Sequence, residues 1–519
     1  MMRKRILAIG IGLTLLAGAC SSDSSDETTT TAGRYDLPPT TAAAAETTTT
    51  AAASETEPYP AVEYDNPGVN RETDTERDAL STFALDVDTG SYTVARRYVT
   101  DGNLPDPDSV RIEEYVNYFD QDYPQPRDDV FAIHIDGGPT PYVSSDRSRV
   151  LRIGIQAMDV ADRDRKDAAL TFVVDTSGSM DQENRLGGVR WALSQLVEEL
   201  NRTDTVAIVE YGSQARVILE PTRVRDRDRI LNAIESLRPN GSTNAAAGMD
   251  LGYRLAHDAF VEGGINRVIL ASDGVANVGV TDANGILDRV REDAEDGIQL
   301  VTVGFGMGNY NDTFMEQLAD NGDGFYAYVD TLEEAERLFV DDLTGTLQTV
   351  AMDARVQVEF DEDTVSAWRL VGYENRDMAD HDFRNDEVDA GEIGAGHTVT
   401  ALYEILLTRE ADYGASDMDL GTVSLRWHET DSEKTTEISR PISADDLSER
   451  FRSTDPRFQM SVMVAEYAEI LRGGGRAYFS DTTLNGLAED LWQLEDLADD
   501  PDVREFIDLV EHAASLRSR

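Results

Sequence analysis

Between residues 167 and 345, short apolar segments alternate with segments whose apolar residues recur at helical spacing. The apolar segments are rich in Val, Ile and Leu and predict strands at 169–175, 205–212, 215–221, 266–274, 298–306 and 324–330. The intervening segments predict helices at 186–200, 228–237, 243–260, 283–297, 311–322 and 332–343. Because the apolar runs lack polar alternation, they indicate strands buried on both faces of a mainly parallel sheet. The pattern predicts a doubly wound α/β domain at 167–345.

The segments that flank this domain follow other patterns. Residues 59–166 predict a strand that leads into a helix from near Ser91, then a helix at 107–119 capped by Asp108 or Ser109, then two alternating strands. Residues 346–450 are rich in strand-like runs, at 354–360, 366–374, 397–407, 418–429 and, more weakly, 436–442. We expect these runs to form a small β-sandwich, joined by strands from before the α/β domain. Residues 451–519 contain two amphipathic helices, which we expect to pack on the sandwich.

The first 58 residues do not read as part of a fold. A basic start is followed by the apolar run Ile6–Gly18, which is too short for a comfortable membrane span and ends in "LAGAC" at Cys20, the only cysteine. Residues 1–20 resemble a bacterial lipoprotein signal, although Ala17 stands where that pattern prefers leucine. The resemblance implies a lipid on Cys20 and an exported protein held at the cell membrane, facing outside the cytoplasm. An ordinary signal peptide with an incidental cysteine is the alternative. Residues 21–58, rich in Thr, Ala and Ser, predict a disordered tether.

The charge of the chain narrows its choice of partners. The formal net charge is −54, and only three of the 46 basic residues are lysines. Such a chain repels the phosphates of a nucleic acid, so we expect no nucleic-acid partner. The acidic residues are spread along the chain and indicate a solvated surface.

Polar oxygen donors lie at the ends of two predicted strands and at the start of one predicted helix of the α/β domain. Asp175 ends the first strand, and Ser177 and Ser179 lie in the loop after it, within "DTSGSM". Thr243 lies at the start of a later helix, and Asp273 ends another strand. Open α/β sheets bind ligands beyond the carboxyl ends of their strands, where the winding reverses. Carboxylates and hydroxyls are hard donors, so the set predicts a site for Mg²⁺, or Mn²⁺, with a position left for an outside ligand.

The same five residues carry a resemblance. Asp175, Ser177, Ser179, Thr243 and Asp273 match, in order, the metal-ion-dependent adhesion site of von Willebrand factor type A domains, which have a Rossmann-like fold. Segments such as "FALDVDTGSYTVARRYV" and "FRSTDPRFQMSVMVAEYAEILRGG" are similar to bacterial YfbK-type proteins. This second resemblance covers residues 80–519. It implies an A domain between two flanking regions, and it secures the fold better than the function.

Three other motifs have simpler interpretations. "DTGS" at 88–91 matches an aspartic-protease signature, but a second copy is absent, so we expect Ser91 or Thr89 to cap a helix. "GEIGAGH" at 391–397 lacks the lysine of a phosphate loop and predicts a turn. "DNGDG" at 320–324 lacks the spacing and closing glutamate of a calcium loop and predicts a helix C-terminal turn. The scattered histidines make a zinc site improbable.

Two classes of function remain. The first is a cell-envelope binding module in which Mg²⁺ or Mn²⁺ bridges the five residues to an Asp or Glu of a protein partner, as the adhesive A domains imply. The second is a structural or assembly protein whose metal site only stabilises the fold. We expect no enzyme, because the sequence shows no general base or nucleophile beside the predicted metal.

Overall fold

The computed structural model describes Tyr64 and residues 68–517, apart from short gaps at 128, 143–144, 275–282, 307–311, 387, 413–417, 431, 433 and 474–481. The predicted signal, the tether and Cys20 lie outside the described residues. The five residues of the predicted metal site all lie within them.

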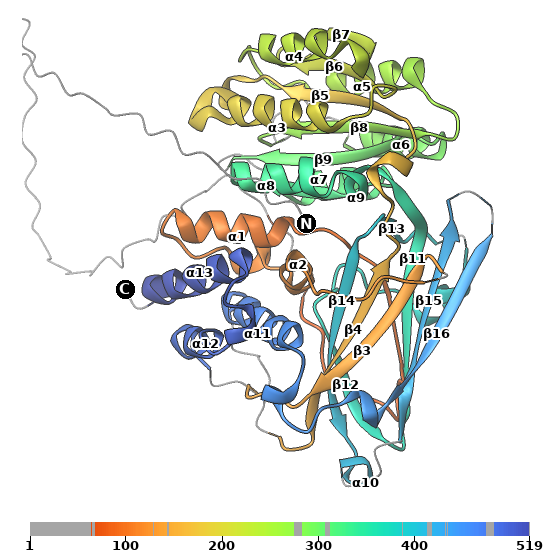
Figure 1. Ribbon diagram of the computed structural model, residues 1–519, viewed down its shortest axis with the longest axis vertical. Coiled ribbons are helices and arrows are strands. Elements are labelled where there is room, and N and C mark those ends of the chain that lie inside the picture. The colour runs from red at the N-terminus through yellow and green to blue at the C-terminus, as the bar shows by residue number, and fades with distance from the viewer. Residues whose placement is uncertain are drawn as a thin grey trace, which may run out of the picture. The chain divides into compact units, whose positions relative to one another are not determined.

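The α/β domain contains a six-stranded sheet in the order β10-β9-β8-β5-β6-β7. Neighbouring strands are parallel except at the edge, where β7 runs antiparallel to β6 (Figure 1). Every residue of β5 is buried, as the unbroken apolar pattern predicts. The strands are β5 (Ala168–Asp175), β6 (Thr205–Tyr211), β7 (Ala215–Arg223), β8 (Ile265–Ser272), β9 (Gln299–Phe305) and β10 (Tyr326–Val329). The predicted doubly wound, mainly parallel sheet is confirmed.

Helices cover both faces of this sheet. Apolar residues of α3, α4, α8 and α9 pack on one face, and those of α5, α6 and α7 pack on the other. The helices are α3 (Arg185–Glu199), α4 (Arg227–Ser236), α5 (Ala245–Ala259), α6 (Ala283–Glu295), α7 (Asp312–Asp320), α8 (Leu332–Glu336) and α9 (Leu343–Leu347). The single helix predicted at 332–343 is thus two short helices joined by a π-helical turn, Arg337–Asp341.

A β-sandwich is built from strands on both sides of the α/β domain in the chain. One sheet has the order β1-β12-β14-β4-β3, and in the other β11 pairs with β13, β15 and β2, while β15 also pairs with β16 (Figure 1). The strands are β1 (Thr73–Asp74), β2 (Leu80–Ala84), β3 (Phe131–Gly138), β4 (Ser148–Ala157), β11 (Thr349–Phe360), β12 (Val365–Val371), β13 (Gly391–Gly394), β14 (Thr398–Leu407), β15 (Asp419–Glu429) and β16 (Thr435–Ser443). The two sheets share one apolar core, in which the ring of Trp427 meets that of Phe131 edge-on at 5.0 Å. Strands from before the α/β domain join the sandwich, as we expected.

Five helices form a second apolar cluster beside the sandwich. They are α1 (Gly90–Thr100), α2 (Ile112–Tyr118), α11 (Pro456–Leu471), α12 (Leu484–Leu491) and α13 (Pro501–Arg517); the short α10 (Arg409–Asp412) lies apart from them at the end of β14 (Figure 1). The cluster also contains Val150, Val371 and Leu402 of the sandwich. The prediction of an amphipathic α11 is wrong, since all residues from Phe458 to Leu471 are buried. Helix α11 is enclosed by other helices as well as by the sandwich, so it has no solvent-facing stripe.

The predicted caps of the first two helices are wrong. The Ser91 hydroxyl donates to the Ser109 carbonyl and accepts from the Arg111 amide, so it joins α1 to the start of α2. Neither Thr89 nor Ser91 caps α1 with its side chain; the Glu114 carboxylate accepts from the Ser91 amide instead (2.7 Å). The second helix begins at Ile112, later than predicted, because residues 107–109 form a separate 3-10 turn.

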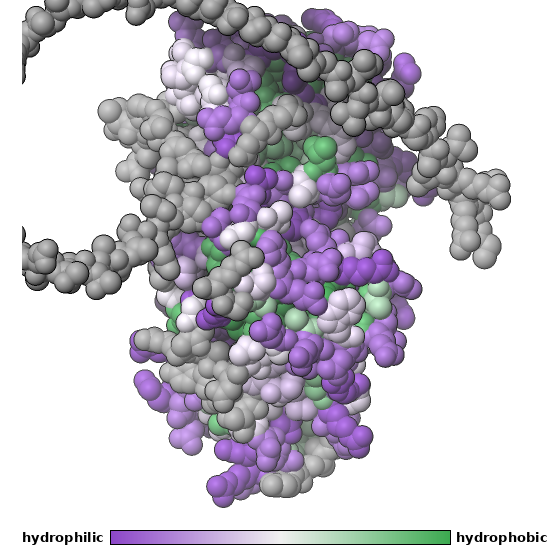
Figure 2. Space-filling view, turned by 90° about the vertical axis from the view of Figure 1, so that its left-hand side faces the viewer, coloured by the Kyte–Doolittle hydropathy of each residue, from purple (hydrophilic) through white to green (hydrophobic). Residues whose placement is uncertain are grey.

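The surface is mainly hydrophilic, with scattered hydrophobic residues, on the face shown in Figure 2. Five large hydrophobic side chains are exposed in the described part of the chain, namely Val69, Met158, Phe260, Leu332 and Trp492. No helix of that part has the length and apolar character needed to cross a membrane.

Candidate functional site

Asp175 is fixed by the backbone and side chains of two strand ends. The Ser177 amide donates to Asp175 Oδ1 at 2.7 Å, and the Ser272 hydroxyl donates to Asp175 Oδ2 at 3.0 Å. Asp175 is fully buried at the end of β5. Both carboxylate oxygens therefore have a hydrogen-bond donor, and Asp175 orients the loop that carries the two serines.

The two serines connect this loop to Asp273. Ser177 Oγ lies 2.9 Å from Ser179 Oγ, and Ser179 Oγ donates to Asp273 Oδ1 at 3.0 Å. The other oxygen of Asp273, Oδ2, accepts from Arg185 Nη1 at 2.8 Å. Arg185 is the first residue of α3, and both side chains of this ion pair are buried. Four of the five predicted residues thus belong to one hydrogen-bonded network that includes the Arg185 guanidinium.

Thr243 lies in the adjoining loop, two residues before α5. The Gly178 amide donates to the Gly241 carbonyl at 3.0 Å, and the Asn240 amide donates to the Thr176 carbonyl. These bonds join the loop of Thr243 to the loop of the two serines. Asn244, not Thr243, caps α5, since its side chain accepts from the Ala247 amide. Thr243 is half-buried.

The network lies where the winding of the sheet reverses. The order β7-β6-β5-β8-β9-β10 means that the chain leaves β5 toward one edge of the sheet and returns at β8 toward the other. Asp175 ends β5, and Asp273 directly follows β8, the neighbouring strand. Doubly wound sheets bind their ligands at this point, and the sequence pattern predicts the site there.

Burial changes the titration of Asp175 and of its neighbour Tyr211. Removal from water raises the pKa of Asp175 to about 6, although its hydrogen bonds with Ser177 and Ser272 act in the opposite direction. Tyr211 is buried beside it, paired with Asp175 between β5 and β6. Burial raises the pKa of the Tyr211 hydroxyl, and the Asp175 carboxyl raises it further. The site therefore holds carboxylates in surroundings that disfavour an uncompensated negative charge.

The residues present fit a small divalent cation. Ser177 Oγ, Ser179 Oγ and Asp273 Oδ1 follow one another at 2.9 and 3.0 Å, and all three are hard oxygen donors. A divalent cation would also supply the positive charge that buried carboxylates require. Ser177, Ser179, Thr243, Asp175 and Asp273 are the residues that would hold it, directly or through water.

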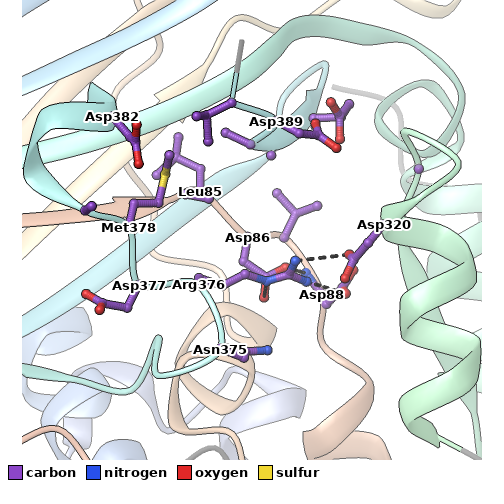
Figure 3. Close-up of a pocket in the computed structure, with 18 residues that line it drawn as sticks. Leu85, Asp86, Asp88, Asp320, Asn375, Arg376, Asp377, Met378, Asp382 and Asp389 are labelled. Atoms are coloured by element: carbon purple, nitrogen blue, oxygen red, sulfur yellow. Dashed lines mark hydrogen bonds and ion pairs between the residues drawn. The ribbon is translucent and has the colours of Figure 1, made fainter. Parts of the chain in front are cut away.

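A second polar region lies between the α/β domain and the sandwich. A pocket of about 370 Å³ is lined by residues that follow β2, by the end of α7 and by the segment 375–392. In Figure 3, the Arg376 guanidinium reaches Asp86, Asp88 and Asp320, at 3.1, 3.4 and 3.0 Å. Asp88, of the "DTGS" motif, also accepts from the Tyr326 amide of β10. This motif is therefore a structural junction between the α/β domain and the segments that flank it.

The motifs "DNGDG" and "GEIGAGH" lie beside the same pocket. Residues 320–324 form the predicted turn after α7, with the Gly322 and Gly324 amides donating to the Ala319 carbonyl. Residues 391–394 form strand β13, and the turn is confined to the residues after it, so the prediction for "GEIGAGH" is wrong in part. Within the described residues, Asp323, Asp389 and Glu392 can bring carboxylate oxygens within 4.8 Å of one another. Burial raises the carboxyl pKa values of all three residues.

Three residues of the main site were not predicted from the sequence. Ser272 precedes Asp273 directly, so its place at a strand end was a usable signal. Tyr211 was recognisable only as an apolar strand residue. Arg185 lies on a helix far from Asp273 in the chain, and nothing in the local sequence links them.

Comparison with known proteins covers nearly all the described chain. A model for the von Willebrand factor type A domain matches residues 169–341, one described as von Willebrand factor matches 59–151, and one described as "Uncharacterized protein YfbK, C-terminal" matches 345–516. The solved structure of a von Willebrand factor type A protein from Catenulispora acidiphila is 15% identical, with a TM-score of 0.43, over 77% of this chain and 89% of that one.

Relatives agree with these matches. Human inter-alpha-trypsin inhibitor heavy chain H4 is 28% identical over 162 residues, which are 30% of this chain and 17% of that protein. The uncharacterized protein YfbK of Escherichia coli (strain K12) is 36% identical over 458 residues, which are 84% of this chain and 78% of YfbK. With its von Willebrand factor type A domain at 169–341 and the YfbK C-terminal region after it, the chain belongs to the YfbK family.

Proposed function

We propose that this protein binds Mg²⁺ or Mn²⁺ at the A domain and uses the cation to bind an acidic protein partner. The observation that carries the proposal is the continuous chain of hard oxygen donors from Ser177 through Ser179 to Asp273, at the switch point of the sheet. Thr243 and Asp175 complete the set from the adjoining loop and strand. A partner's Asp or Glu would supply the remaining ligand of the cation.

The proposal contains no catalytic step. Hydroxyls, a backbone amide and a guanidinium surround the carboxylates of Asp175 and Asp273. These groups orient the carboxylates and balance their charge, and the cation would bridge two proteins through its remaining position.

The first experiment is calorimetric titration of the full chain with MnCl2 and MgCl2, in parallel with Asp175→Ala and Ser179→Ala. We expect one saturable site in the natural protein and at least a roughly tenfold weaker Kd in each variant. Ser194→Ala is a matched control, because the Ser194 hydroxyl donates to the Arg190 carbonyl of its own helix. Equal binding by the natural protein and both site variants would refute the assignment of the site.

The partner is tested separately. The immobilised full chain is offered peptides that differ only in carrying one Asp or one Asn. We expect the natural chain to retain the Asp peptide in MgCl2 and to lose it in EDTA. We expect the Ser179→Ala variant not to retain it. Retention that is the same in EDTA would contradict a cation bridge.

A structural role is the second candidate, and burial favours it. Ser177 and Asp273 are as deeply buried as core residues, at 2% and 4% exposure. A cation there would neutralise buried charge even without a partner. In that case Asp175→Ala would lower the melting temperature without the loss of any peptide or partner.

We also propose that the protein is anchored in the cell envelope by a lipid on Cys20. The support is the apolar run before "LAGAC" and the single cysteine of the sequence. Metabolic labelling with palmitate should mark the natural chain and leave Cys20→Ser unlabelled. Equal labelling of the two would refute the anchor.

A further inference from the structure

The ion pair between Arg185 and Asp273 has a consequence for the proposed cation site. Arg185 Nη1 donates to Asp273 Oδ2 at 2.8 Å, and side-chain exposure is only 6% and 5% in the pair. A buried ion pair is insulated from solvent, so its charges act strongly on any third charge nearby. The guanidinium therefore stands beside the same carboxylate that the cation would use.

The position of Arg185 is fixed by its surroundings. The guanidinium Nε and Cδ lie so close to Gly306, directly after β9, that a Cβ at that residue would overlap them. Gly306 has a φ of +79°, a backbone conformation that favours glycine. The absence of a side chain at Gly306 leaves the space through which the Arg185 side chain reaches Asp273.

The charges of the site can be counted. Asp175 and Asp273 carry two negative charges when ionised, and Arg185 carries one positive charge, so these three residues together have a net charge of about −1. With a divalent cation the net charge is about +1, and with an added carboxylate it is zero. Without Arg185 the same three states have charges of about −2, 0 and −1. The guanidinium thus opposes the cation alone and favours the cation together with an acidic ligand.

We propose that Arg185 makes cation binding and acidic-ligand binding at this site mutually dependent. Arg185 serves as the resident positive charge of the metal-free site. It weakens binding of the cation alone and strengthens binding of a carboxylate once the cation is present. The inference rests on the proposed cation site, and it names the residue that regulates that site.

The test compares Arg185→Gln with the natural full chain by calorimetric titration with MnCl2, with and without acetate as a simple carboxylate. We expect Arg185→Gln to bind Mn²⁺ alone about tenfold more tightly or better, because a like charge has been removed. We expect acetate to tighten Mn²⁺ binding more in the natural protein than in the variant. Arg190→Gln is the matched control: it removes an arginine from the same helix, one that pairs loosely with Glu235 at 3.9 Å. It should bind as the natural chain does.

Each outcome decides between the two proposals. If the natural chain binds Mn²⁺ and Arg185→Gln binds equally or less tightly, the cation site stands and the role of Arg185 is overturned. If only Arg185→Gln binds Mn²⁺, the role of Arg185 is supported in its strongest form. If neither binds, both proposals fall.

Loss of folding is also informative. If Arg185→Gln is unfolded in EDTA but folds in MnCl2, as followed by circular dichroism, the cation has replaced the guanidinium, as the proposal requires. If it folds in neither solution, a cation cannot replace the guanidinium, and the proposal is overturned. Arg185→Lys keeps the positive charge, so its Kd for Mn²⁺ should lie within about threefold of that of the natural chain. If Arg185→Lys binds Mn²⁺ as tightly as Arg185→Gln does, the charge of Arg185 is not the cause.

Discussion

Arg96 of α1 and Asp330, directly after β10, form a two-bond ion pair, with Nε–Oδ2 at 2.7 Å and Nη2–Oδ1 at 2.5 Å. The same guanidinium donates to Glu334 Oε2 and to the Tyr118 hydroxyl. Exposure of the Arg96 and Asp330 side chains is 5% and 2%. The segment before the A domain is therefore bonded to the strand and helix that end the domain.

Removal of this guanidinium should destabilise the whole described structure. In Arg96→Met, Asp330 and Glu334 lose a buried partner, and we expect a loss of about 3–5 kcal/mol in the free energy of unfolding. The measurement is urea unfolding followed by circular dichroism. Arg97→Met is the control, because Arg97 is partly exposed and pairs at 2.9 Å with Asp101, the residue directly after the same helix. The control should cost less than about 1 kcal/mol. Similar losses in the two variants would mean that the buried pair contributes no more than a surface pair.

The sheet of the A domain was predictable because burial there follows the local sequence. Strands β5, β6 and β8 are buried along their whole length. Their apolar runs therefore match the pattern of strands covered on both faces. Helix α11 shows the limit of this reasoning. Its residues Phe458–Leu471 are all buried, by other helices as well as by the sandwich, and a search for one apolar stripe cannot reveal that.

The candidate site was predictable for a related reason, and only in part. Asp175, Ser177 and Ser179 lie in one loop, and the strand ends locate Asp273 beside them. Arg185 could not be predicted, because its ion pair with Asp273 spans two elements, and an arginine that starts a helix is usually solvated. The charge balance of the site, which decides how it binds a cation, is thus a property of the tertiary structure.

Glu113 should make stability depend on pH. It is buried at the start of α2, and its Oε2 has no hydrogen-bond partner among the residues that the structure describes. Burial first, and Glu374 second, raise the pKa of Glu113 to about 7. Because the folded state holds this proton more tightly than the unfolded state, the contribution of Glu113 to stability is lost as pH rises from about 4.5 to about 7.

The size of this effect follows from the shift in pKa. A carboxyl with a pKa of 4.5 in the unfolded chain and about 7 in the folded protein costs about 3 kcal/mol above pH 7. Glu113→Gln is neutral at every pH, so its free energy of unfolding should fall less than that of the natural protein between about pH 5 and about pH 8. Urea unfolding across this range gives the two curves, with exposed Glu489 changed to Gln as a control. Parallel curves for the natural chain and Glu113→Gln would show that Glu113 does not retain its proton.

Gly212, directly after β6, tests the place of Thr243 in the proposed cation site. A Cβ at Gly212 would overlap the Asn240 carbonyl oxygen, and the Asn240 amide donates to the Thr176 carbonyl of the loop that carries the two serines. The larger residue in Gly212→Ala must therefore push the loop of Thr243 away from that of Ser177 and Ser179. We expect the variant to remain folded by circular dichroism. Calorimetric titration should show that it binds Mn²⁺ about tenfold more weakly, or weaker still.

The control for Gly212→Ala is Gly188→Ala in α3, three residues after Arg185, where a Cβ would meet no atom within 4 Å. Alanine favours a helix over glycine by about 1 kcal/mol, so this variant should be as stable as the natural chain or more so. Its Mn²⁺ affinity should be unchanged. If Gly212→Ala binds Mn²⁺ as tightly as Gly188→Ala does, Thr243 contributes nothing to the cation. Ser177, Ser179 and the two aspartates would then have to hold the cation without it, in competition with the Arg185 guanidinium for Asp273.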